Sequence, residues 1–312
     1  MHMDQHSFII RNYRPADSDT YVRFYSEAVS ICHSRDSFLL AWLTGQSARP
    51  DDFSEENLLI AEREGALVGA CHLVPEMAID RVVLRLCVIP GVLAQNIALT
   101  LLRAALERTT ALGATTLHAD LKEDDSANRT LFASLGFAPV RRYTEMTLAL
   151  GAVTVPELKY DRLTYRALEP GGEAEFAQLQ NRVFAGSWGF CPNTTSQIVQ
   201  QLNTPGYGHH GVILAYHARK AVGYCWTAQP RQPNLINRAT NGRIHMMGVA
   251  PEFRNKGQGK HILWSGVKYL ASKGVHTVEL TVDNQNAPAC SLYRSAGFTP
   301  ATALVWYERR MR

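Results

Sequence analysis

The sequence lacks the features that would place the protein in a membrane or a secreted class. No apolar run reaches the roughly 18 residues that a membrane-spanning helix needs, and the N-terminus has no basic segment followed by an apolar stretch. The six cysteines form no Cys-x-x-Cys pair and no zinc-finger spacing. We therefore expect free thiols, no metal site and a cytoplasmic protein.

The chain also has only a small excess of positive over negative charge. The 32 Lys and Arg residues against 28 Asp and Glu residues give a net charge of +4, which is too small to indicate a nucleic-acid-binding surface. Hydrophobic residues make up 46% of the chain and charged residues 19%, a composition that supports packed cores and excludes general disorder. The length of 312 residues predicts two domains of ordinary size.

One segment of the chain occurs twice. Residues 88–139 align without a gap with residues 249–300, and ten of the 52 positions are identical. The identities include prolines and glycines, which usually end helices and strands. These pairs are Pro90 and Pro251, Gly113 and Gly274, Gly136 and Gly297, and Pro139 and Pro300. We infer a tandem repeat with a first domain at 1–150, a linker at 151–162 and a second domain at 163–312. The second copy gains about seven residues within 229–242.

Both copies show the same order of predicted elements. A short strand, one or two helices and a hairpin precede a strand that ends at a proline, after which helix, strand, helix and strand follow. In the second copy the apolar residues Val278, Leu280 and Val282 alternate with polar ones, which is typical of a half-buried strand. We expect each copy to be closed by its own last strand, at 143–150 and at 303–309.

The segment that carries chemistry lies where the predicted strand 243–249 passes into a helix. It reads Val249-Ala-Pro-Glu-Phe-Arg254-Asn255-Lys256-Gly257-Gln258-Gly259-Lys260. Glycines let backbone N–H groups approach a phosphate closely, and a helix N-terminus adds unpaired N–H groups and a positive dipole end. Together with the three basic side chains, the segment predicts a pyrophosphate-binding loop. It matches neither the Walker A motif nor the dinucleotide fingerprint.

The pattern V-x-P-x-x-R-x-x-G-x-G from Val249 to Gly259 resembles a signature of the GNAT acetyltransferase superfamily, as does N-x-x-A-x-x-L-Y-x-x-x-G-F from Asn286 to Phe298. The resemblance covers the whole chain as two copies. It implies an α/β (α+β) fold of two tandem GNAT-like domains, each with a central mixed, mostly antiparallel twisted sheet flanked by helices. It also implies acetyl-coenzyme A (acetyl-CoA) as co-substrate.

The same resemblance implies roles for individual residues. The loop from Arg254 to Lys260 would hold the pyrophosphate of acetyl-CoA, and the strand end at Met247 and Val249 would pair with the pantetheine arm. Asn286 would contact the cofactor, and Tyr293 would lie beside the sulfur as general acid. A backbone N–H near Val249 is expected to stabilise the oxyanion.

The first copy departs from the pattern at the positions that matter for chemistry. In place of Arg254, Gly257, Gly259 and Tyr293 it has Leu93, Asn96, Ala98 and Phe132. These changes remove charge, add side chains where the backbone must approach phosphate, and replace the phenol by a ring without a proton to donate. We expect a degenerate, non-catalytic first domain, and whether it still binds a CoA ligand stays open.

Acetyl transfer to an amine needs a neutral amine and a proton for the departing thiolate. The phenol of Tyr293 can supply that proton, although a core tyrosine is the alternative interpretation of its position on an apolar helix stripe. His245 is the first candidate for the base. In a regular strand it would share a face with Val249, and its ordinary pKa near 6.5 would set the lower limb of the rate–pH profile. Glu279 on the neighbouring strand is the second candidate.

Aromatic residues of the second copy are candidates for the substrate pocket. Trp188, Phe190, Tyr224 and Trp226 belong to this group, and Tyr207, His209 and His210 lie in a glycine-rich loop. A pocket lined by them would favour an apolar or aromatic amine, or a cation over a ring face. Core or interface packing is the alternative.

These observations predict an N-acetyltransferase that moves acetyl from acetyl-CoA to the primary amine of a small molecule, by direct attack in the second domain. We expect a monomer or homodimer, and no metal, nucleic acid or membrane among its partners. Two alternatives stay open. One is an acyl-CoA-binding module without turnover, and the other is an acyltransferase with a different acyl donor or an oxygen acceptor.

Replacing Gly257 with a bulky residue should abolish acetyl-CoA binding, because its side chain would enter the space of the phosphates. The matched change at Asn96, the equivalent position of the first copy, should have little effect. Isothermal titration calorimetry of both variants checks this expectation, and equal losses of affinity would refute the asymmetry between the copies.

Overall fold

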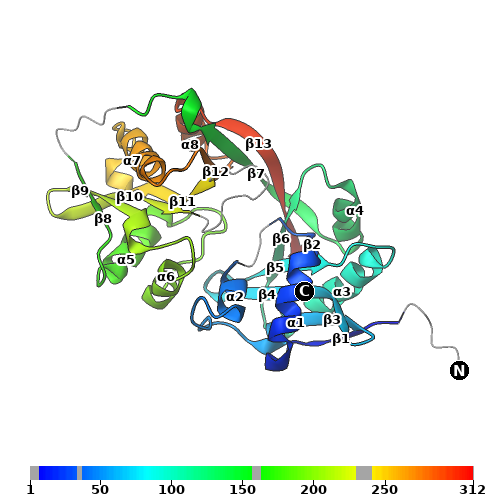
Figure 1. The fold of residues 1–312 in the computed structure, drawn as a ribbon. Coiled ribbons are helices and arrows are strands. Elements are labelled where there is room, and N and C mark those ends of the chain that lie inside the picture. Colours follow the sequence, from blue (N-terminus) through cyan, green and yellow to red (C-terminus); the bar gives the residue numbers. More distant parts are fainter. Residues whose placement is uncertain (1–6, 34–36, 157–162, 230–240, 312) are drawn as a thin grey trace, which may run out of the picture. The chain divides into compact units, whose positions relative to one another are not determined.

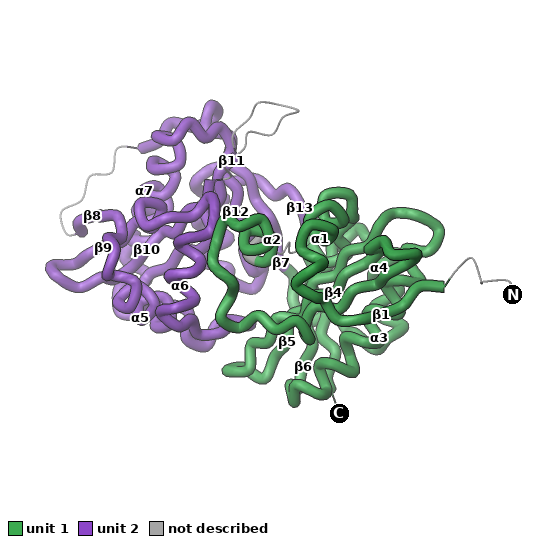
Figure 2. Tube along the Cα trace, turned by 60° about the horizontal axis from the view of Figure 1, so that its bottom comes forward, with its two compact units in different colours: residues 1–142, 303–312 green, residues 143–302 purple. Residues whose placement is uncertain are grey.

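The computed structural model describes residues 7–33, 37–156, 163–229 and 241–311, so most of the predicted insertion and part of the predicted linker lie outside the described residues. The described chain divides into two compact units. Unit 1 consists of residues 1–142 and 303–312, and unit 2 consists of residues 143–302 (Figure 2). None of the helices in the described part of the chain is both long and apolar enough to cross a membrane.

Unit 1 is a mixed sheet with helices on both faces (Figure 1). The strand order is β1-β3-β4-β5-β6-β13, and β2 pairs with β5. Helices α1 and α2 pack on one face, and α3 and α4 on the other. The bounds are β1 Ile9–Asn12, α1 Ser18–Glu27, β2 Val29–Ser30, α2 Ser37–Leu43, β3 Leu58–Arg63, β4 Ala66–Glu76, β5 Arg81–Val88, α3 Ala94–Ala111, β6 Thr116–Lys122, α4 Ser126–Ser134 and β13 Thr299–Arg310.

Unit 2 repeats this plan with the strand order β8-β9-β10-β11-β12-β7. Helices α5 and α6 pack on one face of the sheet, and α7 and α8 on the other. The bounds are β7 Ala138–Ala149, β8 Thr164–Ala167, α5 Glu173–Phe184, α6 Thr195–Leu202, β9 Val212–His217, β10 Lys220–Ala228, β11 Asn241–Val249, α7 Gln258–Ser272, β12 Thr277–Asp283 and α8 Ala287–Ser295. In both units the sheet is antiparallel except for one parallel pair, β5 with β6 and β11 with β12. The predicted fold class is confirmed.

The packing of α7 on the sheet explains a strict sequence requirement. Its buried stripe includes Leu263, Gly266 and Val267, as the helical period predicts. A Cβ atom on Gly266 would lie 2.2 Å from the sulfur of Cys225 on β10. Only glycine therefore allows the helix to approach the strand this closely, and the approach holds the N-terminus of α7 beside the end of β11.

The strand that closes each unit comes from the other copy. β7 belongs to the first copy but runs antiparallel to β12, with Leu148 opposite Val278. β13 belongs to the second copy but runs antiparallel to β6, with Tyr307 opposite Ala119. The prediction that each copy is closed by its own last strand is therefore wrong, and the compact units differ from the consecutive stretches 1–150 and 163–312. Alternating apolar residues predict a strand and its buried face, but they do not name its partner.

The exchange of β7 and β13 between the copies predicts which unit a core substitution in either strand destabilises. Leu148→Ala removes a buried side chain from the core of unit 2, and Tyr307→Ala removes one from the core of unit 1. We expect each to lower the free energy of unfolding by about 2–5 kcal/mol. Hydrogen exchange should show lost protection in β12 for Leu148→Ala and in β6 for Tyr307→Ala. Lost protection in β6 for Leu148→Ala and in β12 for Tyr307→Ala would instead show that the last strand of each copy pairs within its own copy.

Candidate active site

The two parallel strands of unit 2, β11 and β12, pair over a short stretch and then separate. β11 and β12 pair only from Asn241 with Thr277 to Arg243 with Glu279, yet both strands continue beyond these residues. Over 244–249 no strand within the described residues pairs with β11 on the side of β12. Backbone N–H and C=O groups along this edge can therefore bond a ligand that lies between the strands.

A β-bulge marks the place where the strands separate. In the pairing with β10, Trp226 lies opposite Met246 and Thr227 opposite Ile244, so His245 is the extra residue of β11. A bulge breaks the alternation of side chains along the strand. Ile244 consequently packs into the core under α7 and α8, and Met246 packs on the other face under α5 and α6.

The bulge also corrects the predicted position of His245. Its ring lies against Trp226 and Tyr207, with ring centroids 5.0 and 5.2 Å apart, on the face under α5 and α6. Val249 packs on the opposite face, under α7 and α8. The two residues do not share a face, because the expected period of two does not hold through a bulge.

The predicted phosphate loop has the backbone geometry of an anion site. Asn255 and Gly257 both adopt left-handed backbone conformations, with φ of 60° and 79°. Gly257 is the N-cap of α7 and provides no side-chain cap. The N–H of Lys260 bonds back to the carbonyl of Gly257 (3.2 Å), which leaves the N–H groups of Gln258 and Gly259, at the start of this 15-residue helix, to bond an anion. A Cβ on Gly259 would come no closer than 3.4 Å to any atom outside its two chain neighbours and the backbone of α7. The fold itself therefore leaves room for a side chain at this position.

The basic residues of the loop differ in what they bond. Arg254 donates from Nε to the carbonyl of Val249 (3.0 Å) and from Nη2 to that of Val183 (2.6 Å), which ties the loop to β11 and α5. Lys256 donates to the carbonyl of Glu252 (3.0 Å). Lys260 is exposed in the first turn of α7. The donor set of free N–H groups and lysines fits a pyrophosphate, with Arg254 holding the loop in shape.

Asn286 has a structural function that the sequence did not reveal. It is the N-cap of α8, and its side-chain oxygen accepts a hydrogen bond from the N–H of Ala289 (3.2 Å). Asp125 caps α4 of unit 1 in the same way. Contact of Asn286 with a cofactor stays a prediction.

Tyr293 lies in the core between α8 and the sheet of unit 2. Its side chain is 7% exposed, and its hydroxyl has no hydrogen-bond partner in the described part of the chain. Burial, followed by the neighbouring thiols of Cys225 and Cys290, raises the pKa of Tyr293 well above its usual range. The phenol therefore keeps its proton at neutral pH, with no internal acceptor competing for it.

His245 is held as a neutral ring. The side-chain amide of Gln201 donates to its Nε2 (2.6 Å), and Nδ1 carries the proton and donates weakly to the hydroxyl of Tyr207 (3.4 Å). Burial, with a smaller effect from the positive charge of Arg243, lowers the pKa of His245 to about 4. The expectation that His245 titrates near pH 6.5 is therefore wrong, because partial burial disfavours the charged form of the ring.

Glu279 lies on the same face as His245, since its neighbours in β12 point into the core under α7 and α8. Its Oε1 accepts a hydrogen bond from the side chain of Asn241 (2.8 Å). Beside it, Arg243 donates to the hydroxyl of Thr281 (2.5 Å) and pairs with Glu145 of β7 (3.4 Å). The exchanged strand thus contributes a carboxylate to this polar face.

The four predicted pocket aromatics fall into two groups. Tyr224 and Trp226 are fully buried in the core under α5 and α6, so the structure leaves them no surface for direct contact with a substrate. Trp188 and Phe190 are half-buried in the loop after α5, next to Tyr143 and Phe184, respectively. These two keep accessible surface. In the glycine-rich loop, His209 pairs with Glu173 of α5 (2.7 Å).

Several site residues escaped the sequence interpretation. Three of them contact a candidate base or a charged residue: Gln201 contacts His245, Asn241 contacts Glu279, and Glu145 contacts Arg243. They come from α6, β11 and β7, which are far apart in the chain. None of these three residues lies in a sequence motif. They are identified only once the separation of β11 and β12 is known from the structure.

Comparison with known proteins agrees with this geometry. The family model "Acetyltransferase (GNAT) family" matches residues 22–137 and 174–298, one match in each copy. This chain belongs to the GNAT acetyltransferase family and has its tandem two-domain architecture. It is accordingly an acyltransferase, and the family implies an acetyl-CoA donor.

Among its relatives, the mycothiol acetyltransferase of Arthrobacter sp. strain FB24 is 32% identical over 57% of this chain, and the match spans 55% of that protein. The mycothiol acetyltransferase of Thermomonospora curvata is 29% identical over 80% of this chain and 81% of its own length. Among solved structures, a tandem GNAT protein from the clavulanic acid biosynthesis pathway covers 98% of this chain and 99% of its own, with a TM-score of 0.72 and 17% identity. That structural likeness supports the fold.

The lowered pKa of His245 predicts how stability depends on pH. The folded protein keeps this ring neutral down to a pKa of about 4, whereas the unfolded chain binds a proton near pH 6.5. The stabilising contribution is therefore fully present above pH 6.5 and is lost as the pH falls toward 4. Between pH 7 and pH 5 the loss in the free energy of unfolding should be about 2 kcal/mol.

Urea unfolding at pH 7 and pH 5 measures this contribution. His245→Gln should lose less stability on acidification than the wild type, by that amount, and the exposed His210→Gln variant serves as the matched control. Equal losses in the wild type and His245→Gln would show that His245 titrates near its ordinary pKa.

Proposed function

We propose that this protein is an acetyl-CoA-dependent N-acetyltransferase that acetylates the primary amine of a small molecule in unit 2. The free edge of β11 beside the uncapped N-terminus of α7 carries the proposal. One element offers N–H and C=O groups to an extended arm, and the other offers N–H groups to the phosphates at the end of that arm.

The residues that would hold acetyl-CoA follow from these two elements. The backbone from Asn255 to Gly259 and the side chain of Lys260 take the pyrophosphate, and the edge at Met247 and Val249 takes the pantetheine arm. When bound, acetyl-CoA supplies an activated acetyl group as a thioester. An N–H of β11 past the bulge would stabilise the negative charge that develops on the carbonyl oxygen.

Tyr293 is the proposed general acid. Its hydroxyl has no internal partner and keeps its proton at neutral pH, as the raised pKa requires. It lies on the face under α7 and α8, in the same core cluster as Met247 and Val249 of β11. A buried phenol there can donate to a departing thiolate without competition from water.

The proposed acceptor side is the opposite face of the sheet, where both base candidates lie. His245 already uses its acceptor nitrogen for Gln201, so it must break that bond before it takes a proton. Glu279 has one oxygen bonded to Asn241 and a second oxygen without a partner in the described residues. This difference favours Glu279 as the base, directly or through a water, with His245 as a neutral polar contact for the acceptor.

The names of the relatives suggest a direction for the acceptor. Several are mycothiol acetyltransferases, so mycothiol-related amines belong in the first substrate panel. The face around Glu279 carries Arg243, Glu145 and Thr281 in bonded pairs, and such a mixed polar surface fits a hydroxylated amine better than an aromatic one.

Release of free CoA thiol from acetyl-CoA, measured across a panel of small amines, tests the proposed function. We expect turnover with at least one hydroxylated primary amine and formation of its N-acetyl product by mass spectrometry. Binding of acetyl-CoA without turnover on any amine would identify a binding module. Faster turnover with a longer acyl donor or an alcohol would assign a different acyl transfer.

Tyr293→Phe should lower kcat by about 10²–10⁴-fold, the usual contribution of a general acid, with the affinity for acetyl-CoA nearly unchanged. The ring still fills its place, since Phe132 is fully buried at the equivalent position of unit 1. Single-turnover kinetics together with calorimetry separate the two effects. A wild-type rate constant in this variant would remove Tyr293 from the mechanism.

A further inference from the structure

Unit 1 has the same strand split as unit 2, but its own chain fills the split. β5 and β6 pair only from Arg81 with Thr116 to Val83 with His118, although β5 continues to Val88. Beyond that point β2 pairs antiparallel with β5, with Val29 opposite Val88. β4 occupies the other edge of β5 along its whole length, so β2 lies on the side of β6.

Backbone hydrogen bonds carry the segment across the split. The N–H groups of Ile31 and Cys32 both donate to the carbonyl of Leu86 on β5, at 2.8 and 3.3 Å. The next N–H, of His33, donates to the carbonyl of Asp120 on β6 (2.8 Å). The segment 29–33 thus satisfies backbone groups on both separated strands, which a ligand arm would otherwise bond.

The side chains anchor this segment in the core. Ile31 is 7% exposed and Cys32 is 1% exposed, and both belong to the hydrophobic core under α3 and α4. Displacing the segment would expose two apolar side chains and leave buried backbone groups unpaired, each of which costs free energy. The segment is therefore a fixed part of the unit.

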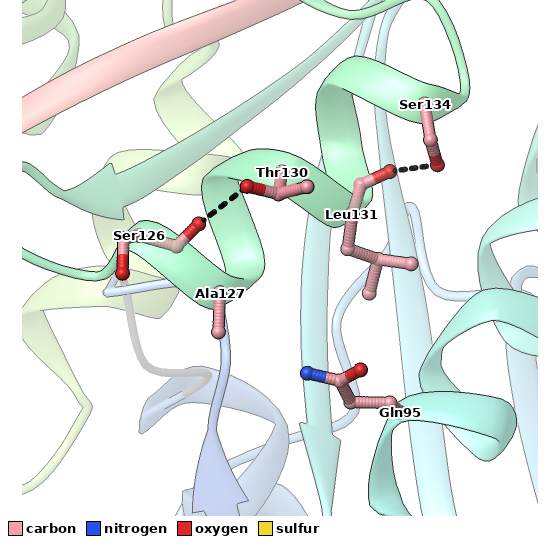
Figure 3. Close-up of a pocket in the computed structure, with 6 residues that line it drawn as sticks. All are labelled: Gln95, Ser126, Ala127, Thr130, Leu131 and Ser134. Atoms are coloured by element: carbon pink, nitrogen blue, oxygen red, sulfur yellow. Dashed lines mark hydrogen bonds between the residues drawn. The ribbon is translucent and has the colours of Figure 1, made fainter.

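The outer part of the same region is open but carries no charge. A groove of about 340 Å³ lies between the start of α3 and α4 (Figure 3). It is lined by Gln95, Ser126, Ala127, Thr130, Leu131 and Ser134. Gln95 stands where unit 2 has Lys256, so a pyrophosphate in this groove would find no cationic side chain among the residues that line it.

We propose that residues 29–33 occupy, in unit 1, the place that the acyl-carrying arm of acetyl-CoA takes in unit 2. The inference rests on the proposed function, because it uses the same binding geometry. Two consequences follow. Each chain binds one acetyl-CoA, and restoring the phosphate loop of unit 1 does not restore binding, since the arm still has no place to lie.

Calorimetry with acetyl-CoA on the full chain tests both consequences. The background variant is Gly257→Trp, which silences unit 2. Into it we introduce Leu93→Arg, Gln95→Lys, Asn96→Gly, Ala98→Gly and Leu99→Lys, which rebuild the loop of unit 1 with its cations. The matched control makes the reverse exchange in unit 2 of an otherwise wild-type chain, with Arg254→Leu, Lys256→Gln, Gly257→Asn, Gly259→Ala and Lys260→Leu.

We expect one site per chain in the wild type and none in the background, the rebuilt variant or the matched control. Two sites in the wild type, or binding by the rebuilt variant within about tenfold of the wild-type Kd, would overturn the inference. Absence of binding in the wild type would instead contradict the proposed function.

Hydrogen exchange gives a second measurement that does not depend on binding affinity. The amides of Ile31, Cys32 and His33 should be protected to the same degree with and without saturating acetyl-CoA. Protection should increase along β11, around Met247 and Val249, when acetyl-CoA is added. Rapid exchange at 31–33, or loss of their protection on adding acetyl-CoA, would show that the segment leaves the split.

Discussion

The separation of two parallel strands after three paired positions is the constraint on which the site of unit 2 depends. It leaves one edge of β11 without a strand partner in the described residues. The buried phenol of Tyr293 approaches from one face, whereas His245 and Glu279 lie on the other. In the proposed function, the proton donor and the base therefore lie on opposite faces of the sheet.

Unit 1 meets the same constraint in a different way. Its separated strands are bridged by residues 29–33, which satisfy the backbone groups that a ligand would bond. If those groups are satisfied internally, as we propose, glycines and an arginine at the start of α3 have no ligand to bind. The replacement of Arg254, Gly257 and Gly259 by Leu93, Asn96 and Ala98 agrees with this, because each substitution favours an ordinary helix start over an anion site.

The exchange of β7 and β13 makes the cores of the two units depend on each other's sequence. Leu148 of the first copy completes the core of unit 2, and Tyr307 of the second copy completes the core of unit 1. β7 also brings Glu145 to Arg243, so a residue of the degenerate copy takes part in the polar face of the proposed site. The departures from the motif in the first copy therefore do not free its last strand from this packing.

The sequence by itself determined the duplication, the class of fold, the order of elements and the loop from Arg254 to Lys260, because these rest on local periodicity and on glycine and helix-terminus chemistry. Only the tertiary structure decided strand partners, the bulge at His245, its lowered pKa and the occupant of the split in unit 1. Those features come from contacts between segments far apart in the chain. A strand pattern leaves its partner open, and the pKa of a histidine depends on how much water the fold removes from around its ring.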